Sequence, residues 1–132
     1  MSSLHYDAEY HDLIWMEFDG RTWEEFSLLV SELKVFVADI TAPYSLVFYP
    51  DKDMPRGNPI PHISNMSRFL EADPRFNFMI AIVPSWMRIT SIFANMASKL
   101  FRDRFSQNAP VVVTSREQAL AVYLSHHRNT SA

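Results

Sequence analysis

The chain contains no cysteine, and this absence excludes three kinds of protein chemistry at once. Without thiols the protein forms neither a disulfide framework nor a zinc ribbon, and it has no thiol nucleophile. Glycine is almost as scarce, because only Gly20 and Gly57 occur in 132 residues. A phosphate-binding loop needs several glycines so that backbone N–H groups can approach the anion. The sequence therefore has neither a P-loop nor a Rossmann fingerprint, which excludes most nucleotide-binding enzymes.

An excess of basic charge and long apolar runs are lacking as well. The net charge of -3 argues against a DNA- or RNA-binding module, whose contact face is normally basic. No apolar run approaches the roughly 20 residues of a membrane span, and the polar start MSSLHYDAEYHD is not a signal peptide. Hydrophobic residues make up 48% of the chain, as in ordinary globular proteins. We therefore expect one cytoplasmic domain over residues 1–128, a disordered tail over residues 129–132 and no cofactor.

The strands are predicted from alternation and from short apolar runs. Residues 5–10 alternate polar and less polar side chains, which indicates an edge strand. A tight connection at residues 11–12 joins it to a second strand over residues 13–18. Residues 44–49 form an apolar run between prolines, which fits a strand covered on both faces. Residues 76–83 are the most apolar strand, and we expect them at the centre of the sheet.

Two helices are predicted from capping boxes and one from its apolar spacing. Thr22 and Glu25 form a T-x-x-E box, and Ser115 and Gln118 form an S-x-x-Q box. A short amphipathic helix begins at His62 and ends before the Asp-Pro pair at residues 73–74. The outer face of the first helix is expected to be polar, with Glu24, Ser31, Glu32 and Lys34. Its inner stripe at 3.6-residue spacing consists of Trp23, Phe26, Leu29, Val30, Leu33 and Val37.

A long helix over residues 86–104, a short strand over residues 110–113 and a final helix complete the chain. The predicted order is β-β-α-β-α-β-α-β-α. This order indicates an α/β fold with a mostly parallel mixed sheet, a leading hairpin and helices packed against the sheet.

That order, together with two segments, resembles the STAS or SpoIIAA-like domains of bacterial anti-sigma-factor antagonists. The first segment is FDGRTWEEF at residues 18–26, which resembles the passage from strand to helix in a divergent stand-alone branch labelled STAS/SEC14-like. The second is VTSREQAL at residues 113–120, which resembles the last strand and helix start of that branch. The resemblance implies a STAS-like fold and a regulatory role through contacts with a protein partner.

The family's phosphorylation switch is where this sequence departs from the resemblance. Typical antagonists carry an Asp-Ser or Asp-Thr pair at the start of the helix after the third strand, and the hydroxyl is phosphorylated. The matching stretch, PHISNMS at residues 61–67, has no such pair. Ser64 is the nearest positional match and Ser67 lies deeper in the helix. We therefore expect an interaction module without the usual phosphoserine switch.

The residues that could carry chemistry gather after the third strand. Ligands bind beyond the carboxyl ends of strands in open α/β sheets, so the loop over residues 50–62 is where a site would lie. Asp51 and Asp53 could hold a cation or act as acid and base, or they could belong to a solvated turn. His62 could serve catalysis, although capping or solvent contact explains it as well. His126 and His127 are adjacent and point apart, so they form no helical metal pair.

An apolar surplus marks the helix over residues 86–104. Its first turns are apolar most of the way round, more than one sheet-facing stripe requires. Either a thick core absorbs these side chains or they form a second buried surface, and a homodimer through this helix is the preferred version of the second reading.

We therefore predict a non-enzymatic, regulatory protein–protein interaction module. The alternative is a Sec14-like carrier of a hydrophobic ligand such as a lipid. A small hydrolase or transferase would need Asp51, Asp53 and His62 to converge, and no G-x-S-x-G elbow supports a hydrolase triad. The residues predicted to contact a partner or ligand are Asp51, Lys52, Asp53, Arg56, His62, Ser64, Trp86 and Met87.

Overall fold

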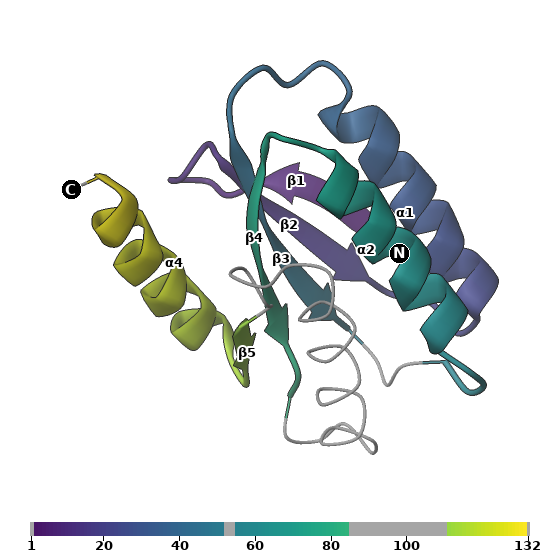
Figure 1. The fold of residues 1–132 in the computed structure, drawn as a ribbon. Helices are drawn as coiled ribbons and strands as arrows, with labels where there is room; N and C mark the ends of the chain where they lie inside the picture. The colour runs from purple at the N-terminus through teal and green to yellow at the C-terminus, as the bar shows by residue number, and fades with distance from the viewer. Residues whose placement is uncertain (1, 52–54, 85–110, 132) are drawn as a thin grey trace.

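The protein is built around one five-stranded sheet (Figure 1). The computed structural model describes residues 2–51, 55–84 and 111–131. The first strand pairs antiparallel with the second, and all later neighbours are parallel, which confirms an α/β fold with a mixed sheet. In their order across the sheet, the strands are β1 (Ser3–Tyr6), β2 (Leu13–Phe18), β3 (Tyr44–Pro50), β4 (Phe76–Ile82) and β5 (Val111–Val113).

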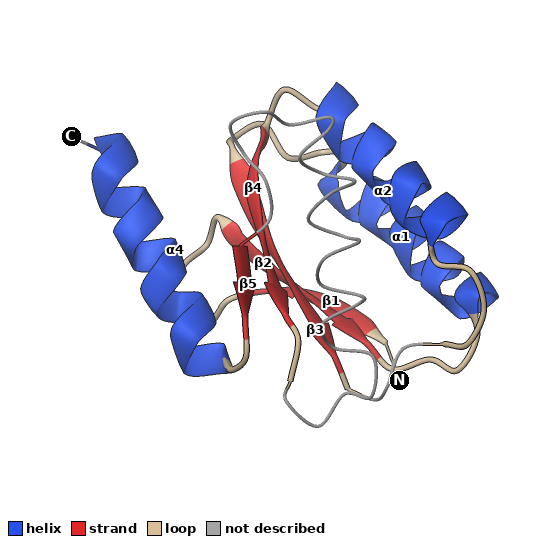
Figure 2. Ribbon diagram, turned by 60° about the horizontal axis from the view of Figure 1, so that its bottom comes forward, coloured by secondary structure: helices blue, strands red, loops and turns tan. Residues whose placement is uncertain are grey.

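The described helices cover the two faces of this sheet unequally. Helices α1 (Trp23–Val37) and α2 (Ile60–Ala72) lie side by side on one face, and α4 (Arg116–Ser131) lies on the other (Figure 2). The shared face of α1 and α2 follows from topology. Both helices connect consecutive parallel strands in one direction across the sheet, and right-handed crossovers then place them on the same side.

Alternation along the strands divides the buried side chains into two cores. In β2, Ile14 and Met16 face α1 and α2, whereas Leu13 and Trp15 belong to the core on the α4 side. The pairing of β2 with β3 places Ile14 beside Leu46, so that apolar side chains share a face across the strands. All six residues of the predicted inner stripe of α1 are buried in the first core.

Both predicted capping boxes are confirmed. The Thr22 hydroxyl accepts a hydrogen bond from the Glu25 backbone N–H at 3.2 Å. The Ser115 hydroxyl likewise accepts from the Gln118 N–H at 3.2 Å. These bonds satisfy N–H groups that have no partner within the helix.

The two glycines lie where a larger residue fits poorly. A Cβ on Gly20 would stand 2.7 Å from Cε1 of Phe18. Gly57 has a φ of +108°, a backbone conformation that residues other than glycine rarely adopt, and it lies against the indole of Trp23. Both positions border the passage from the sheet into α1.

Several predicted boundaries are corrected by the structure. The first strand is Ser3–Tyr6 rather than residues 5–10, and residues 7–12 form the connection in place of a tight turn at residues 11–12. Asp7 stabilises this connection, because its carboxylate accepts from the N–H groups of Glu9 at 3.0 Å and Tyr10 at 3.1 Å. Such Asx turns favour irregular backbone over a strand.

The centre of the sheet was also placed wrongly. β3 occupies it, and β4 is the next strand along. Both strands are covered on both faces, so apolar composition alone does not distinguish the two positions. Helix α2 begins at Ile60, two residues before the expected start, and α4 extends to Ser131 through residues that were assigned to a tail.

Among the described residues, no helix is long and apolar enough to cross a membrane. The helix expected over residues 86–104 lies outside the described residues.

Candidate functional site

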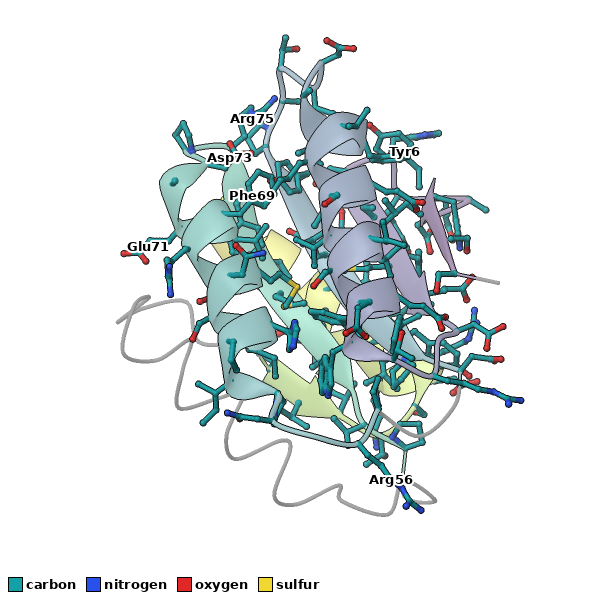
Figure 3. The ribbon with its side chains drawn as sticks, turned by 90° about the vertical axis from the view of Figure 1, so that its right-hand side faces the viewer. Tyr6, Arg56, Phe69, Glu71, Asp73 and Arg75 are labelled. Atoms are coloured by element: carbon teal, nitrogen blue, oxygen red, sulfur yellow. The ribbon has the colours of Figure 1, made fainter. Side chains whose placement is uncertain are left out.

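The predicted site lies at the carboxyl ends of β2 and β3, where α1 and α2 begin. Asp51 follows β3 directly and is exposed, while its backbone N–H donates to the Phe18 carbonyl at 2.8 Å. Arg56 is also exposed, and Figure 3 shows it at the end of the molecule opposite Asp73 and Arg75. The other predicted residues of the loop and of the following helix, Lys52, Asp53, Trp86 and Met87, lie outside the described residues.

His62 is the predicted site residue with the most defined surroundings. Its ring stacks on the indole of Trp23, with centroids 5.1 Å apart and planes within 8° of parallel. Its Nδ1 lies 3.3 Å from the hydroxyl oxygen of Ser27. Because Trp23 and Ser27 belong to α1, the histidine joins the first turn of α2 to the beginning of α1.

In the described part of the chain, Ser27 and His62 are a serine and a histidine within hydrogen-bond distance, as in a nucleophile with its general base. A catalytic pair of this kind needs a third group that orients the histidine and donors that stabilise an oxyanion. Within the described ranges, no carboxylate makes a hydrogen bond to His62. The contact links α1 to α2, and the stacking of His62 on Trp23 links the same two helices.

Trp23 has a further property that sequence reasoning missed. Its indole N–H is buried and has no hydrogen-bond partner among the described residues. An unpaired buried donor costs stability, so the indole is held here by packing against His62 and Phe26.

Ser64, the positional match to the family's phosphorylated residue, is not presented at a helix start. It is the fifth residue of α2, and only 8% of its surface is exposed. The neighbouring Ser67 is fully buried, and its hydroxyl donates to the Ser64 carbonyl at 3.0 Å. Both serines therefore face the core between α2 and the sheet.

The outward face of α1 carries a feature that the sequence analysis did not identify. Leu28 is 64% exposed and Val35 is 76% exposed, although both are large apolar residues. Glu25 and Glu32 are also exposed. Residues 25, 28, 32 and 35 follow one another at spacings of three and four, so acidic and apolar side chains take turns along one stripe of the helix. We call these four residues the α1 stripe. Beside it lies an open groove of about 310 Å³, whose lining residues are Ser2, Asp19, Glu25, Leu28, Leu29 and Glu32.

Polar and aromatic side chains also meet on the face of the sheet that α4 covers in part. The guanidinium of Arg116 lies 4.3 Å from the ring centroid of Tyr49 and 5.1 Å from that of Trp15. It donates to Glu17 at 2.6 Å, and Glu17 also lies 3.1 Å from Nε2 of His5. This cluster fixes the first turn of α4 over β1, β2 and β3.

Comparisons with known proteins identify no relative. No family model matches the chain, and neither a curated protein nor a solved structure is similar enough to count as a match. Among the residues that the structure describes, no group of three or more metal-ligating side chains could hold a metal ion. The surfaces described above are therefore the basis for any statement about function.

Proposed function

We propose that the chain is a non-enzymatic interaction module and that its α1 stripe binds a basic amphipathic helix of another protein. The observation that carries the proposal is the exposure of Leu28 and Val35, at 64% and 76%, on one helical stripe with Glu25 and Glu32. A single exposed leucine is ordinary on a protein surface. Two apolar residues seven positions apart on the solvent face instead provide two anchor points, two helical turns apart.

The charge of the stripe defines the chemistry of the partner. Glu25 and Glu32 flank Leu28, and Asp19 and Glu25 line the adjoining groove. An acidic rim around apolar anchors complements lysine or arginine next to leucine-like side chains. A second copy of this chain would bring a second acidic stripe against the first, and repulsion between their carboxylates opposes such a homodimer. The partner is therefore a different, basic protein.

The predicted site supports this proposal by its position. His62 contacts Trp23 and Ser27, so the start of α2 and the first turns of α1, where the stripe begins, form one continuous structure. The resemblance of residues 18–26 and 113–120 to STAS domains supports an interaction role by analogy, because a fold does not by itself define a function. A lipid carrier would need a closed apolar cavity. The pockets of about 390 and 310 Å³ that the described residues line are open and include carboxylates, which differs from a closed apolar cavity.

Photo-crosslinking in the native host tests the proposal. A photoreactive phenylalanine analogue is placed at position 28 or 35, with position 65 on α2 as an exposed control. We expect positions 28 and 35 to crosslink to the same basic protein and position 65 not to do so. Crosslinks at position 65 alone, or a second copy of this chain as the product, would contradict the proposal.

Variants then measure the binding of the purified partner. Leu28→Asp removes an apolar anchor, and we expect at least a tenfold loss of affinity. Glu32→Lys reverses one rim charge, and we expect weaker binding together with a smaller dependence on salt. Ile60→Asp is the matched control, since Ile60 is also an exposed apolar residue, at 46%, but belongs to α2. If Ile60→Asp abolishes binding while Leu28→Asp does not, the surface lies at the start of α2 and the α1 stripe is not the docking site.

A further inference from the structure

An open pocket of about 390 Å³ lies at the other end of the molecule from the predicted site. Its walls come from β1, the connection between β1 and β2, the end of α1 and the residues before β3. In Figure 3, Tyr6, one of its lining residues, lies toward the same end of the molecule as Asp73 and Arg75, and Arg56 lies at the other end. The pocket is separate from the α1 stripe, and every residue that lines it is described by the structure.

One wall of the pocket is aromatic and only partly covered. The rings of Tyr6 and Phe36 have centroids 5.2 Å apart and are tilted by 46°. Tyr6 is 41% exposed, and Ile40 continues the apolar wall from the end of α1. Aromatic faces next to solvent accept both apolar chains and organic cations.

Two of the residues that line the pocket are negatively charged. Asp12 and Asp39 both line the pocket, and the Tyr123 hydroxyl donates to Oδ1 of Asp12 and so holds that carboxylate in place. Asp39 comes two residues after Val37, the last residue of α1. The carbonyl groups at a helix C-terminus carry partial negative charge, so an acidic residue there is electrostatically unfavourable unless a cation is near.

The lysine and arginine side chains near the end of α1 have other partners. Among its lining residues there is no lysine or arginine, and His11 is the one basic group. Arg75 donates to the Ile40 carbonyl, but its charge is paired with Asp73. Lys34, in the last turn of α1, lies over the ring of Phe69 at 5.5 Å. The pocket therefore combines negative charge and an aromatic wall with space for a small molecule.

We propose that this pocket binds a small organic cation, an alkylammonium whose charged group contacts Asp39 and Asp12 and whose chain lies on Tyr6 and Phe36. A volume near the lower end of the range for ligand pockets limits the ligand to a short chain. The proposal does not depend on the interaction proposed for the α1 stripe.

Titration with pentylammonium, followed by the backbone amide resonances of the full chain, tests the inference. We expect saturable shifts at residues 6, 36 and 39–41, with weaker binding as salt increases. 1-Pentanol, which has the same chain without the charge, should bind at least threefold more weakly. No saturable shift with pentylammonium, or equal affinity for pentanol, would overturn the proposal.

Two variants with unchanged shape test the role of the pocket's charge. Asp39→Asn should weaken pentylammonium binding about three- to fivefold, as expected for the loss of one accessible ion pair. Glu117→Gln removes an exposed carboxylate from α4 and should leave the affinity unchanged. Asp39→Asn should fold normally, because it removes an acidic group from a helix C-terminus. Equal affinities of the two variants would show that Asp39 does not contact the cation and would overturn the proposed site.

Discussion

At the scale of single residues, Asp73 is an ionisable group held by several neighbours. Arg75 binds its carboxylate at both oxygens, with Nε and one terminal nitrogen each at 2.9 Å. These bonds are the main reason that the pKa of Asp73 falls from 3.8 to about 2, and the Arg75 backbone N–H and Tyr44 hydroxyl contribute further. The side chain of Asp73 is only 6% exposed, so these charge-assisted bonds lie in a protected environment. The bond from the Tyr44 hydroxyl joins the end of α2 to the start of β3.

This arrangement predicts how stability depends on acid. The folded pKa lies below the unfolded value, so the ionised carboxylate stabilises the fold above about pH 4, and this contribution is lost as pH falls toward 2. We expect Asp73→Asn to lower the free energy of unfolding by up to about 2 kcal/mol at pH 7. Urea unfolding at pH 7, 4 and 2.5 measures the difference between the two proteins, which should change little from pH 7 to 4 and shrink from pH 4 to 2.5. A difference that stays constant with pH would show that the carboxylate charge is not the cause.

At the scale of elements, α1 depends on its N-cap. Thr22 accepts from the Glu25 N–H at 3.2 Å, and its hydroxyl lies 3.3 Å from the Glu25 carboxylate, so the two residues bond reciprocally. We expect Thr22→Ala to reduce the free energy of unfolding by about 1 kcal/mol. Denaturant unfolding measures this loss, and Thr22→Ser, which keeps the hydroxyl, should recover most of it. Equal destabilisation by both substitutions would assign the effect to the lost methyl group.

The elements that were predicted correctly from the sequence depend on local physics. A capping box spans three residues and an amphipathic stripe spans one helix, so both are visible in a short window. The misplaced elements depend on more distant or less regular contacts. The carboxylate of Asp7 accepts from the indole N–H of Trp15 at 2.8 Å as well as from its local backbone, and this combination ends β1 early. The central position of β3 follows from the pairing of all five strands, which no single segment of the sequence shows.

The candidate surfaces show the same division. Ser27 and His62 are 35 residues apart, and Arg116 and Glu17 are 99 residues apart, so no local pattern indicates that they meet. The α1 stripe is different, because Leu28 and Val35 are seven residues apart on a helix that was predicted correctly. Their spacing was available in the sequence. It was missed because most residues on the outer face of α1 are polar or charged, so the whole face was predicted to be polar.

At the scale of the whole molecule, the described helices bury different numbers of side chains on the two faces of the sheet. Helix α1 buries six side chains against its face, and α2 lies beside it. Within residues 116–126 of α4, the buried side chains are Ala119 and Tyr123. The Arg116 cluster adds a polar anchor at the first turn, but the Arg116 side chain is itself 50% exposed. Burial of apolar area is the main stabilising contribution, so the two sides of the molecule should differ in local stability.

This difference predicts how the molecule opens. Helix α4 should separate from the sheet at a lower free energy than α1, and its amides should exchange hydrogen faster under native conditions. Hydrogen exchange followed by mass spectrometry measures both helices in one experiment. Arg116→Gln removes the ion pair with Glu17 and weakens the contacts with Tyr49 and Trp15, so it should speed exchange further in α4 while leaving α1 unchanged. Glu117→Gln, one position along on the same helix, is the control and should have little effect. Equal protection of α1 and α4 in the unaltered protein would mean that the second face is held as firmly as the first, and that the two sides of the sheet unfold as one unit.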